Sequence, residues 1–191
     1  MNYYMVNEYI FSQALGGGNF AAVFLGRKKD SNVPIAIKRL ERNKPKNEKT
    51  FKDEISILRE LKHKNIVSLI DFFKTNKHYY IVINYCNGGT LFSCHKKYKE
   101  KFGRTFTEEI VQYIMRQIVD AIKYFHGKNI IHRDIKMENI LVNFENELDR
   151  INLNMLNATI IISDFGISTH IDPLKNIIHL QVLYLIWILR L

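Results

Sequence analysis

The sequence predicts an α+β protein whose first part is built mainly from strands and whose second part begins with helices. Residues 8–85 contain five short apolar runs and one helical pattern, which predicts a small, mostly antiparallel sheet with a single helix. Residues 86–176 start with amphipathic helical patterns and continue into short apolar runs separated by polar segments. Residues 177–191 are mostly apolar and are set apart as a third stretch.

Length and composition favour a globular chain of one or two domains. The 191 residues are 47% apolar and 25% charged, which is typical of folded proteins and argues against wholesale disorder. The formal charge of +9 raises the possibility of an acidic partner, but solvated basic faces over residues 38–64 and 96–104 are the simpler interpretation. A nucleic-acid interface is not expected, because no separate patch interleaves aromatic and basic residues.

The cysteines and the N-terminus indicate an intracellular, reducing setting. Cys86 and Cys94 cannot make a disulfide framework, and the opening Met1–Met5 has no basic-then-apolar signal pattern. We therefore expect a cytoplasmic protein.

A glycine-rich turn joins the first two predicted strands. Residues 9–15 alternate loosely, three glycines follow at 16–18, and the second apolar run begins at Val23. Glycine lets backbone N–H groups approach phosphate oxygens without a Cβ in the way. The turn is a candidate phosphate-binding loop, although glycine-rich hairpins without a ligand are common.

Two residues of opposite charge are expected to pair in the first part. Lys38 closes the short strand 34–38, and residues 49–62 have helical spacing. The apolar face of that helix is formed by Phe51, Ile55 and Leu58. Glu54 shares this face, and a carboxylate directed at a core needs a partner, for which Lys38 is the natural candidate.

The second part opens with two predicted helices. Residues 91–101 form the first, which has a basic end. Thr107 is a good N-cap for the second, a long amphipathic helix that runs to Phe125 and has Gly127 as its C-cap.

A dense polar segment, residues 132–139, lies between two short apolar runs and is expected to be a loop held between buried elements. It carries a carboxylate at Asp134, an ammonium at Lys136 and an amide at Asn139. A second carboxylate, Asp164, follows the apolar run 160–162 and precedes Phe165 and Gly166. A base, a point charge for phosphate and metal-binding oxygens are the groups that phosphoryl transfer needs.

Taken in order, the glycine turn, the Lys38 strand, the Glu54 helix, the 132–139 loop and the Asp164 motif resemble those of protein kinases of the serine/threonine class. The resemblance implies a two-lobed, kinase-like α+β fold. It also implies an ATP-dependent protein serine/threonine kinase, with ATP and Mg²⁺ as cofactors and a protein Ser or Thr as substrate. The alternative function is a catalytically silent nucleotide-binding or interaction module.

The resemblance implies a role for each polar residue of the motifs. Asp134 would orient or deprotonate the substrate hydroxyl, and Lys136 would neutralise the γ-phosphate and favours serine/threonine over tyrosine. Asn139 and Asp164 would hold Mg²⁺. The lysine and glutamate of the first part, as a pair, would hold the α- and β-phosphates.

The resemblance also implies a nucleotide-binding set in which the hinge, residues 84–86, meets adenine through backbone groups. The set is Leu15, Gly16, Gly17, Gly18, Asn19, Phe20, Ala21, Val23, Ala36, Lys38, Ile83, Asn84, Cys86 and Leu141. Three positions depart from the common pattern. Ala21 replaces a third glycine, Asn84 stands where an acidic residue is common, and Thr90 stands where many kinases place a carboxylate on the ribose.

Residues 18–24 and 84–89, together with a polar insertion at 143–158, look most like the autophagy-initiating kinases, a likeness that leaves regulatory protein partners open. The resemblance ends near residue 176, because no Ala-Pro-Glu motif follows Gly166. We therefore expect an incomplete C-terminal lobe and impaired activity.

Residues 177–191 are open to three interpretations: a shifted reading frame or wrong splice, a helix that covers exposed core, or a membrane or partner contact. Membrane contact is not favoured, because the run is shorter than the roughly 20 apolar residues of a span.

Overall fold

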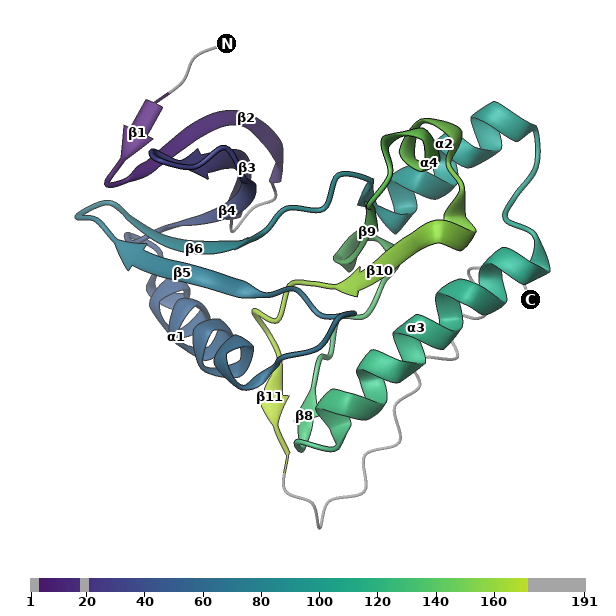
Figure 1. The fold of residues 1–191 in the computed structure, drawn as a ribbon. Helices are drawn as coiled ribbons and strands as arrows, with labels where there is room; N and C mark the ends of the chain where they lie inside the picture. Colours follow the sequence, from purple (N-terminus) through teal and green to yellow (C-terminus); the bar gives the residue numbers. More distant parts are fainter. Residues whose placement is uncertain (1–3, 18–20, 172–191) are drawn as a thin grey trace. The chain divides into compact units, whose positions relative to one another are not determined.

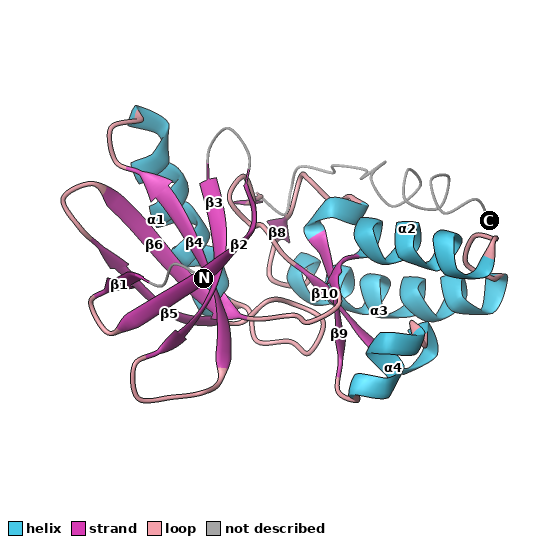
Figure 2. Cartoon of the chain, turned by 90° about the horizontal axis from the view of Figure 1, so that it is seen from above, coloured by secondary structure: helices cyan, strands magenta, loops and turns pink. Residues whose placement is uncertain are grey.

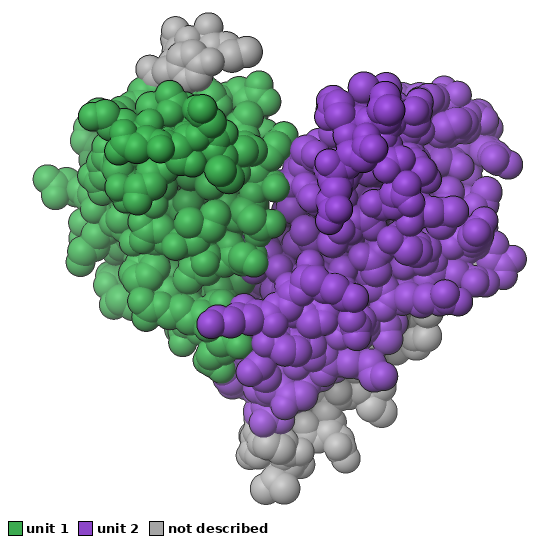
Figure 3. Space-filling model, in the orientation of Figure 1, with its two compact units in different colours: residues 1–60, 68–85 green, residues 61–67, 86–191 purple. Residues whose placement is uncertain are grey.

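The computed structural model describes residues 4–17 and 21–171 (Figure 1). The chain divides into two compact units, one made of residues 1–60 and 68–85 and the other of residues 61–67 and 86–191 (Figure 3). The division expected from the sequence began the first part at residue 8 and assigned residues 61–67 to it. The expected apolar stretch at 177–191 lies outside the described residues.

Unit 1 is built on one antiparallel sheet of six strands in the order β1-β2-β3-β4-β6-β5. The strands are β1 Tyr4–Val6, β2 Tyr9–Gly17, β3 Ala21–Lys28, β4 Pro34–Glu41, β5 Leu69–Lys74 and β6 His78–Asn84. The sequence predicted five of them and missed β1, which is only three residues long. The helix α1 spans Pro45–Glu60 and begins four residues before the predicted start, with proline at the first helical position.

The two faces of this sheet are covered differently. On one face, an aromatic and aliphatic cluster buries Tyr9, Phe11, Ile35, Ile37, Tyr80 and Val82. The alternate residues of β4 and β6 point to the other face, where α1 packs against β4, β5 and β6. Phe51 of α1 stacks there on Tyr79, with 4.6 Å between ring centroids. Side chains from α1 and from alternate positions of β4 therefore meet on one face.

Unit 2 combines helices with two small sheets (Figure 2). Its helices are α2 Leu91–Phe102, α3 Glu108–His126 and α4 Glu147–Asn152. One sheet has the order β10-β9-β7, and the other pairs β8 with β11. Their strands are β7 Gly89–Thr90, β8 Ile130–Ile131, β9 Ile140–Phe144, β10 Ala158–Ile162 and β11 Thr169–His170. Short 3-10 turns at Met137–Asn139 and Met155–Asn157 complete the unit.

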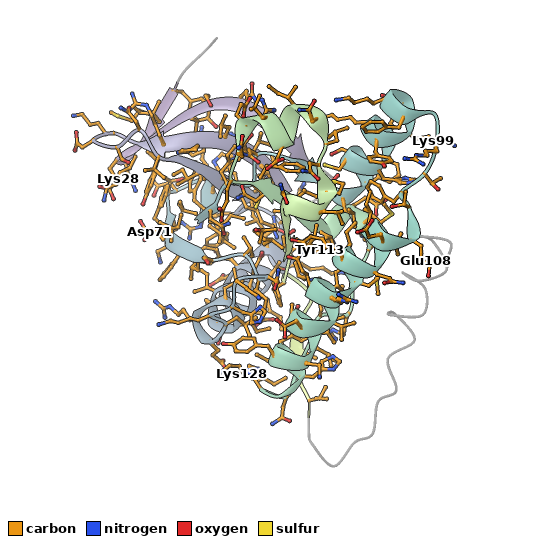
Figure 4. All side chains as sticks on the ribbon, turned by 45° about the vertical axis from the view of Figure 1, so that its right-hand side comes forward. Lys28, Asp71, Lys99, Glu108, Tyr113 and Lys128 are labelled. Carbon is orange, nitrogen blue, oxygen red and sulfur yellow. The ribbon has the colours of Figure 1, made fainter. Side chains whose placement is uncertain are left out.

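The helix α3 is capped where the sequence predicts. The Thr107 hydroxyl accepts a hydrogen bond from the backbone N–H of Ile110 at 3.4 Å. Figure 4 labels Glu108 and Lys128 at the two ends of the helix. Gly127 is the C-cap but keeps a right-handed φ of −61°, and the left-handed turn comes at Asn129, with a φ of 59°. The chain therefore reverses two residues later than a glycine cap would predict.

The polar insertion at 143–158 is shorter than expected and partly helical. Residues 143 and 144 complete β9, and residue 158 begins β10, so the connection is residues 145–157. The side chain of Asn146 caps α4 by accepting a hydrogen bond from the N–H of Leu148 at 2.8 Å. Among the described residues, no helix combines the length and apolar character that a membrane crossing requires.

We predict that Gly26→Ala destabilises unit 1. A Cβ on residue 26 would lie 2.6 Å from the carbonyl oxygen of Ile10 and 2.9 Å from a methyl of Ile37, so β2 and β3 would have to separate. Overpacking of this kind typically costs about 1–3 kcal/mol in the free energy of unfolding, measurable by urea denaturation. Gly16→Ala is the matched control, because its Cβ would meet nothing within 4 Å. Equal stability of the two variants would contradict the prediction.

Candidate active site

Lys38 and Glu54 form the predicted pair in unit 1. The ammonium of Lys38 on β4 lies 2.9 and 2.8 Å from the two carboxylate oxygens of Glu54 on α1. The side chains are 13% and 4% exposed, respectively. A charge buried to this degree is costly unless it is paired, so each residue fixes the other in place.

The apolar residues predicted to line a nucleotide pocket in unit 1 share the face of Lys38. In the sheet register, Val23 lies opposite Lys38, and Ala36 lies opposite Ile83. Residues 36 and 38 are two apart on one strand, so these four side chains project to the same side. The unit therefore presents a lysine beside a small apolar surface. This combination suits a nucleotide, whose ring is apolar and whose phosphates are negatively charged.

The remaining members of the predicted nucleotide set in unit 1 fall into three groups. Leu15, Gly16 and Gly17 end β2 and are exposed, and Ala21 begins β3. Asn84 ends β6, where its side-chain oxygen accepts a hydrogen bond from the N–H of Ser68 at 2.7 Å. Three further residues lie outside the described ones: Gly18, Asn19 and Phe20.

Cys86 and Leu141 belong to unit 2. Burial raises the pKa of the Cys86 thiol to about 12, so the thiol stays protonated and unreactive. Leu141 lies on β9 and pairs with Thr90 of β7. Thr90, which departs from the usual kinase carboxylate, is the N-cap of α2 and accepts from the N–H of Ser93 at 3.1 Å.

Asp134, Lys136 and Asn139 contact one another in unit 2. One carboxylate oxygen of Asp134 accepts hydrogen bonds from the Lys136 ammonium and from the Asn139 amide nitrogen, each at 2.8 Å. The same amide nitrogen donates to the backbone carbonyl of Asp134 at 2.9 Å. The hydrogen bond to Asp134 raises the pKa of Lys136, and the charges of Asp134, Glu138 and Asp164 add to this effect. Lys136 is therefore a cation at neutral pH.

The loop that carries these groups is anchored by His132, which is 1% exposed. Its Nε2 donates to the carbonyl of Ser163 at 2.9 Å, while its Nδ1 accepts from the N–H of Asp134 at 3.2 Å, so the ring is the Nε2–H tautomer. Its edge packs on Phe165, with 4.6 Å between ring centroids. The sequence analysis gave His132 no role, since only the fold brings residues 132 and 163 together.

Asp164 is positioned by its neighbour in the chain. The backbone N–H and the hydroxyl of Ser163 both donate to the carbonyl of Asn139, each at 2.9 Å. Asp164 then adopts a left-handed φ of 63°, as does Arg133 in the other loop, with a φ of 69°. Such conformations in non-glycine residues are uncommon and often accompany functional sites.

The residues present fit a magnesium ion. Asn139 uses its amide nitrogen for both hydrogen bonds to Asp134, so these bonds do not occupy its amide oxygen, which can act as a metal ligand. Together with the exposed carboxylate of Asp164, it supplies hard oxygen donors of the kind Mg²⁺ prefers. The described residues contain no group of three or more His, Cys, Asp or Glu side chains arranged to hold a metal ion. Magnesium does not need one, because it usually takes one or two protein ligands and completes its shell with phosphate and water.

A buried amide network supports the strand that leads to Asp164. The side-chain nitrogen of Asn65 donates to Gln117 of α3 at 2.8 Å and to the carbonyl of Ile160 at 2.7 Å. The side-chain oxygen of Gln117 in turn accepts from the N–H of Ile160 at 3.0 Å. Gln117 could not be singled out from the sequence, because it resembles any polar residue of an amphipathic helix.

Comparison with known proteins decides the family. The family model for the protein kinase domain matches residues 9–183. The chain belongs to the protein kinase family. The expected kinase fold and the resemblance to serine/threonine kinases are thereby confirmed.

Three curated relatives illustrate the match. The chain is 36% identical over 169 residues to the probable serine/threonine-protein kinase fhkC of Dictyostelium discoideum, covering 86% of this chain and 26% of the relative. It is 36% identical over 171 residues to the serine/threonine-protein kinase ULK1 of Homo sapiens, covering 87% and 16%. A probable myosin light chain kinase of Dictyostelium discoideum is 34% identical over 162 residues, covering 84% and 42%. The chain thus spans less than half the length of each relative.

We predict that the Lys38–Glu54 pair is strongly coupled in stability. Lys38→Met and Glu54→Leu, made separately, each break this buried ion pair and should lower the free energy of unfolding by roughly 3 kcal/mol. The double variant should lose much less than the sum, because it removes both charges. Urea denaturation of all four proteins measures the coupling.

The exposed pair Lys52 and Glu48 on the same helix is the control, with side chains 68% and 57% exposed. Its variants should show no measurable coupling. Additive losses at Lys38 and Glu54 would mean that the two charges do not depend on each other.

Proposed function

We propose that this protein kinase transfers the γ-phosphoryl group of Mg²⁺-bound ATP to the hydroxyl of a protein Ser or Thr. The observation that carries the proposal is the position of the Asp134 carboxylate, fixed by Lys136 and Asn139 at 2.8 Å each. Phosphoryl transfer depends mainly on positioning and on charge neutralisation, and this cluster supplies a base, a cation and a metal-ligand oxygen together.

Each residue of the cluster has a distinct task in this proposal. Asp134 orients the substrate hydroxyl and accepts its proton. Lys136 stays protonated and balances negative charge that develops on the transferred group. Asn139 holds the Asp134 carboxylate through its amide nitrogen and offers its oxygen, with Asp164, to Mg²⁺, which when bound neutralises phosphate charge.

In unit 1, Lys38 binds the α- and β-phosphates of ATP. Its pairing with both oxygens of Glu54 fixes a side chain that would otherwise be flexible, so the ammonium is held in one position. Val23, Ala36 and Ile83, on the same face of the sheet, suit the apolar body of the adenine ring.

We also propose a substrate class, a cellular setting and a kinase subfamily for this protein. A Ser or Thr substrate is favoured by Lys136, and a cytoplasmic setting with regulatory protein partners by the sequence. Membership of the autophagy-initiating kinases is favoured by residues 18–24 and 84–89, while ULK1 and fhkC match at the same 36% identity. Residues 1–191 expressed by themselves are expected to transfer phosphate slowly, because they contain no Ala-Pro-Glu motif.

The first test replaces the proposed base. Asp134→Asn keeps the size of the side chain but removes its negative charge, so phosphate transfer should fall by roughly 10²–10⁴-fold. The assay follows ³²P transfer from ATP to a generic basic protein, and ATP affinity is measured in parallel. Transfer at the same rate in both proteins, with normal ATP binding, would leave the silent nucleotide-binding module as the better description.

The second test addresses the metal. Asp164→Asn should weaken ATP binding in the presence of Mg²⁺ and change binding in EDTA little, because the carboxylate acts on the nucleotide through the ion. Isothermal titration with and without Mg²⁺ gives both affinities. Glu138→Gln is the matched control, since Glu138 is an exposed carboxylate in the turn Met137–Asn139, next to Asn139, and has no proposed ligand role. The same ATP affinity with and without Mg²⁺ in the unmodified protein would exclude the proposed metal site.

A further inference from the structure

Unit 2 contains a hollow beside the connection between β9 and β10, and none of the residues that line it belongs to the catalytic motifs. It has a volume of about 320 Å³ and is bounded by α2, the start of α3 and the connection between β9 and β10. Its apolar and aromatic lining is Tyr98, Phe102, Ile110, Leu153, Met155 and Leu156. The volume falls at the small end of the range of about 300–1,000 Å³ that is typical of ligand pockets.

The connection between β9 and β10 forms one wall of the hollow. Hydrogen bonds within the connection hold this wall in shape. The carboxylate of Asp149 accepts from the side-chain nitrogens of Asn154 and Asn157 at 2.9 and 3.0 Å. Leu153 takes a left-handed φ of 54°, which ends α4 and directs the chain into the lining. The Lys101 ammonium on α2 donates to the carbonyl of Ile151 at 3.0 Å and joins the two walls. The hollow is therefore bounded by fixed elements.

Apolar side chains are exposed on the elements that bound the hollow. Phe102, which lines it, is 43% exposed, and α4, whose Asp149 and Asn152 also line it, exposes Ile151 by 57% and Leu148 by 65%. Grouped apolar exposure beside a hollow is more typical of a binding surface than scattered single residues are.

The α2 side of the hollow is strongly basic. Residues 96–104 carry Lys96, Lys97, Lys99, Lys101 and Arg104 against a single acid, Glu100. Figure 4 labels Lys99 on this helix. The acidic groups on the other sides are Asp149, which is already bonded within the connection, Glu147, which pairs with Arg150, and Glu108 and Glu109 at the start of α3.

We propose that this groove docks a segment of a partner protein in which apolar anchor residues are flanked on one side by carboxylates. The anchors fill the hollow and cover Phe102, and the carboxylates lie along the basic end of α2. The acids at the start of α3 orient the segment, because they would repel its carboxylates if it bound in the reverse direction. The two features that carry the proposal, the basic helix end and the insertion, have no role in phosphoryl transfer.

Other occupants match these observations less well. An anionic membrane would neutralise the lysines, but a bilayer surface does not fill a walled hollow. A second copy of the chain would bring the same excess of positive charge to the interface. A short acidic segment with apolar anchors satisfies both the hollow and the charge.

The probe is a fluorescein-labelled 12-residue peptide with four Asp or Glu residues followed by Leu-Ala-Leu. Two companion peptides replace either the acids with Lys or the leucines with Ala. Binding to the chain is followed by fluorescence anisotropy up to millimolar protein. The parent peptide should bind at least about 10-fold more tightly than either companion. One companion lacks the carboxylates that face the lysines, and the other lacks the apolar anchors that fill the hollow.

The protein variants test the surface directly. Lys101→Glu and Phe102→Ser should each weaken parent-peptide binding by about 10-fold. The matched controls are Lys128→Glu, which makes the same charge change past the far end of α3 (Figure 4), and Phe92→Ser, which alters a 51% exposed residue of α2 outside the hollow. Both should bind normally, and thermal unfolding confirms that each variant is folded.

Several results would overturn the proposal. These are the absence of peptide binding, equal binding of the three peptides, or equal losses in the control variants. Binding to phosphatidylserine vesicles that Lys101→Glu abolishes, without peptide binding, would assign the surface to membranes. Light scattering that shows a dimer disrupted by Phe102→Ser would assign it to a second copy. Peptide binding that appears only after removal of residues 177–191 would assign the groove to the chain's own segment.

Discussion

The antiparallel register between β9 and β10 determines the geometry of the candidate site in unit 2. Ile140 pairs with Ile162, so the adjoining residues Asn139 and Ser163 meet at one end of the ladder and form two hydrogen bonds. Asn139 holds the Asp134 carboxylate, and Asp164 follows Ser163 directly. A slip of one residue would turn every side chain of the strand to the opposite face, so the base and the metal ligand depend on one backbone pairing.

In unit 1, side chains point alternately to the two faces of β4, and this alternation positions Lys38. Residues 36 and 38 of β4 share the face that α1 covers, whereas residues 35 and 37 enter the aromatic cluster on the other side. The burial of that cluster stabilises the sheet, and the hydroxyl of its Tyr9 donates a hydrogen bond to Asp71 at 2.7 Å. The Lys38–Glu54 pair links β4 to α1 and holds the two elements at a fixed distance. The aromatic cluster and the Lys38–Glu54 pair therefore lie on opposite faces of the same strand.

Much of this arrangement could be predicted from the sequence, because its signals are local. Periodicity located α3 and most strands of unit 1, and the spacing of Asp134, Lys136 and Asn139 identified the candidate site. The supporting contacts could not be predicted, since they join distant segments: Asn65 reaches Ile160 across 95 residues. The helix α4 was missed for another reason. It spans six residues and buries none of them, so it leaves no apolar periodicity to detect.

The paired strands β9 and β10 have the catalytic groups at one end and the connecting loop at the other. Its five residue pairs place the Ile140–Ile162 end about 14 Å from the Phe144–Ala158 end, given the usual rise of a strand. The connection 145–157 joins the strands at the latter end, beyond the last pair. Insertions, deletions or exchange of that loop can therefore diversify its surface during evolution while the pairing that aligns the catalytic groups stays unchanged.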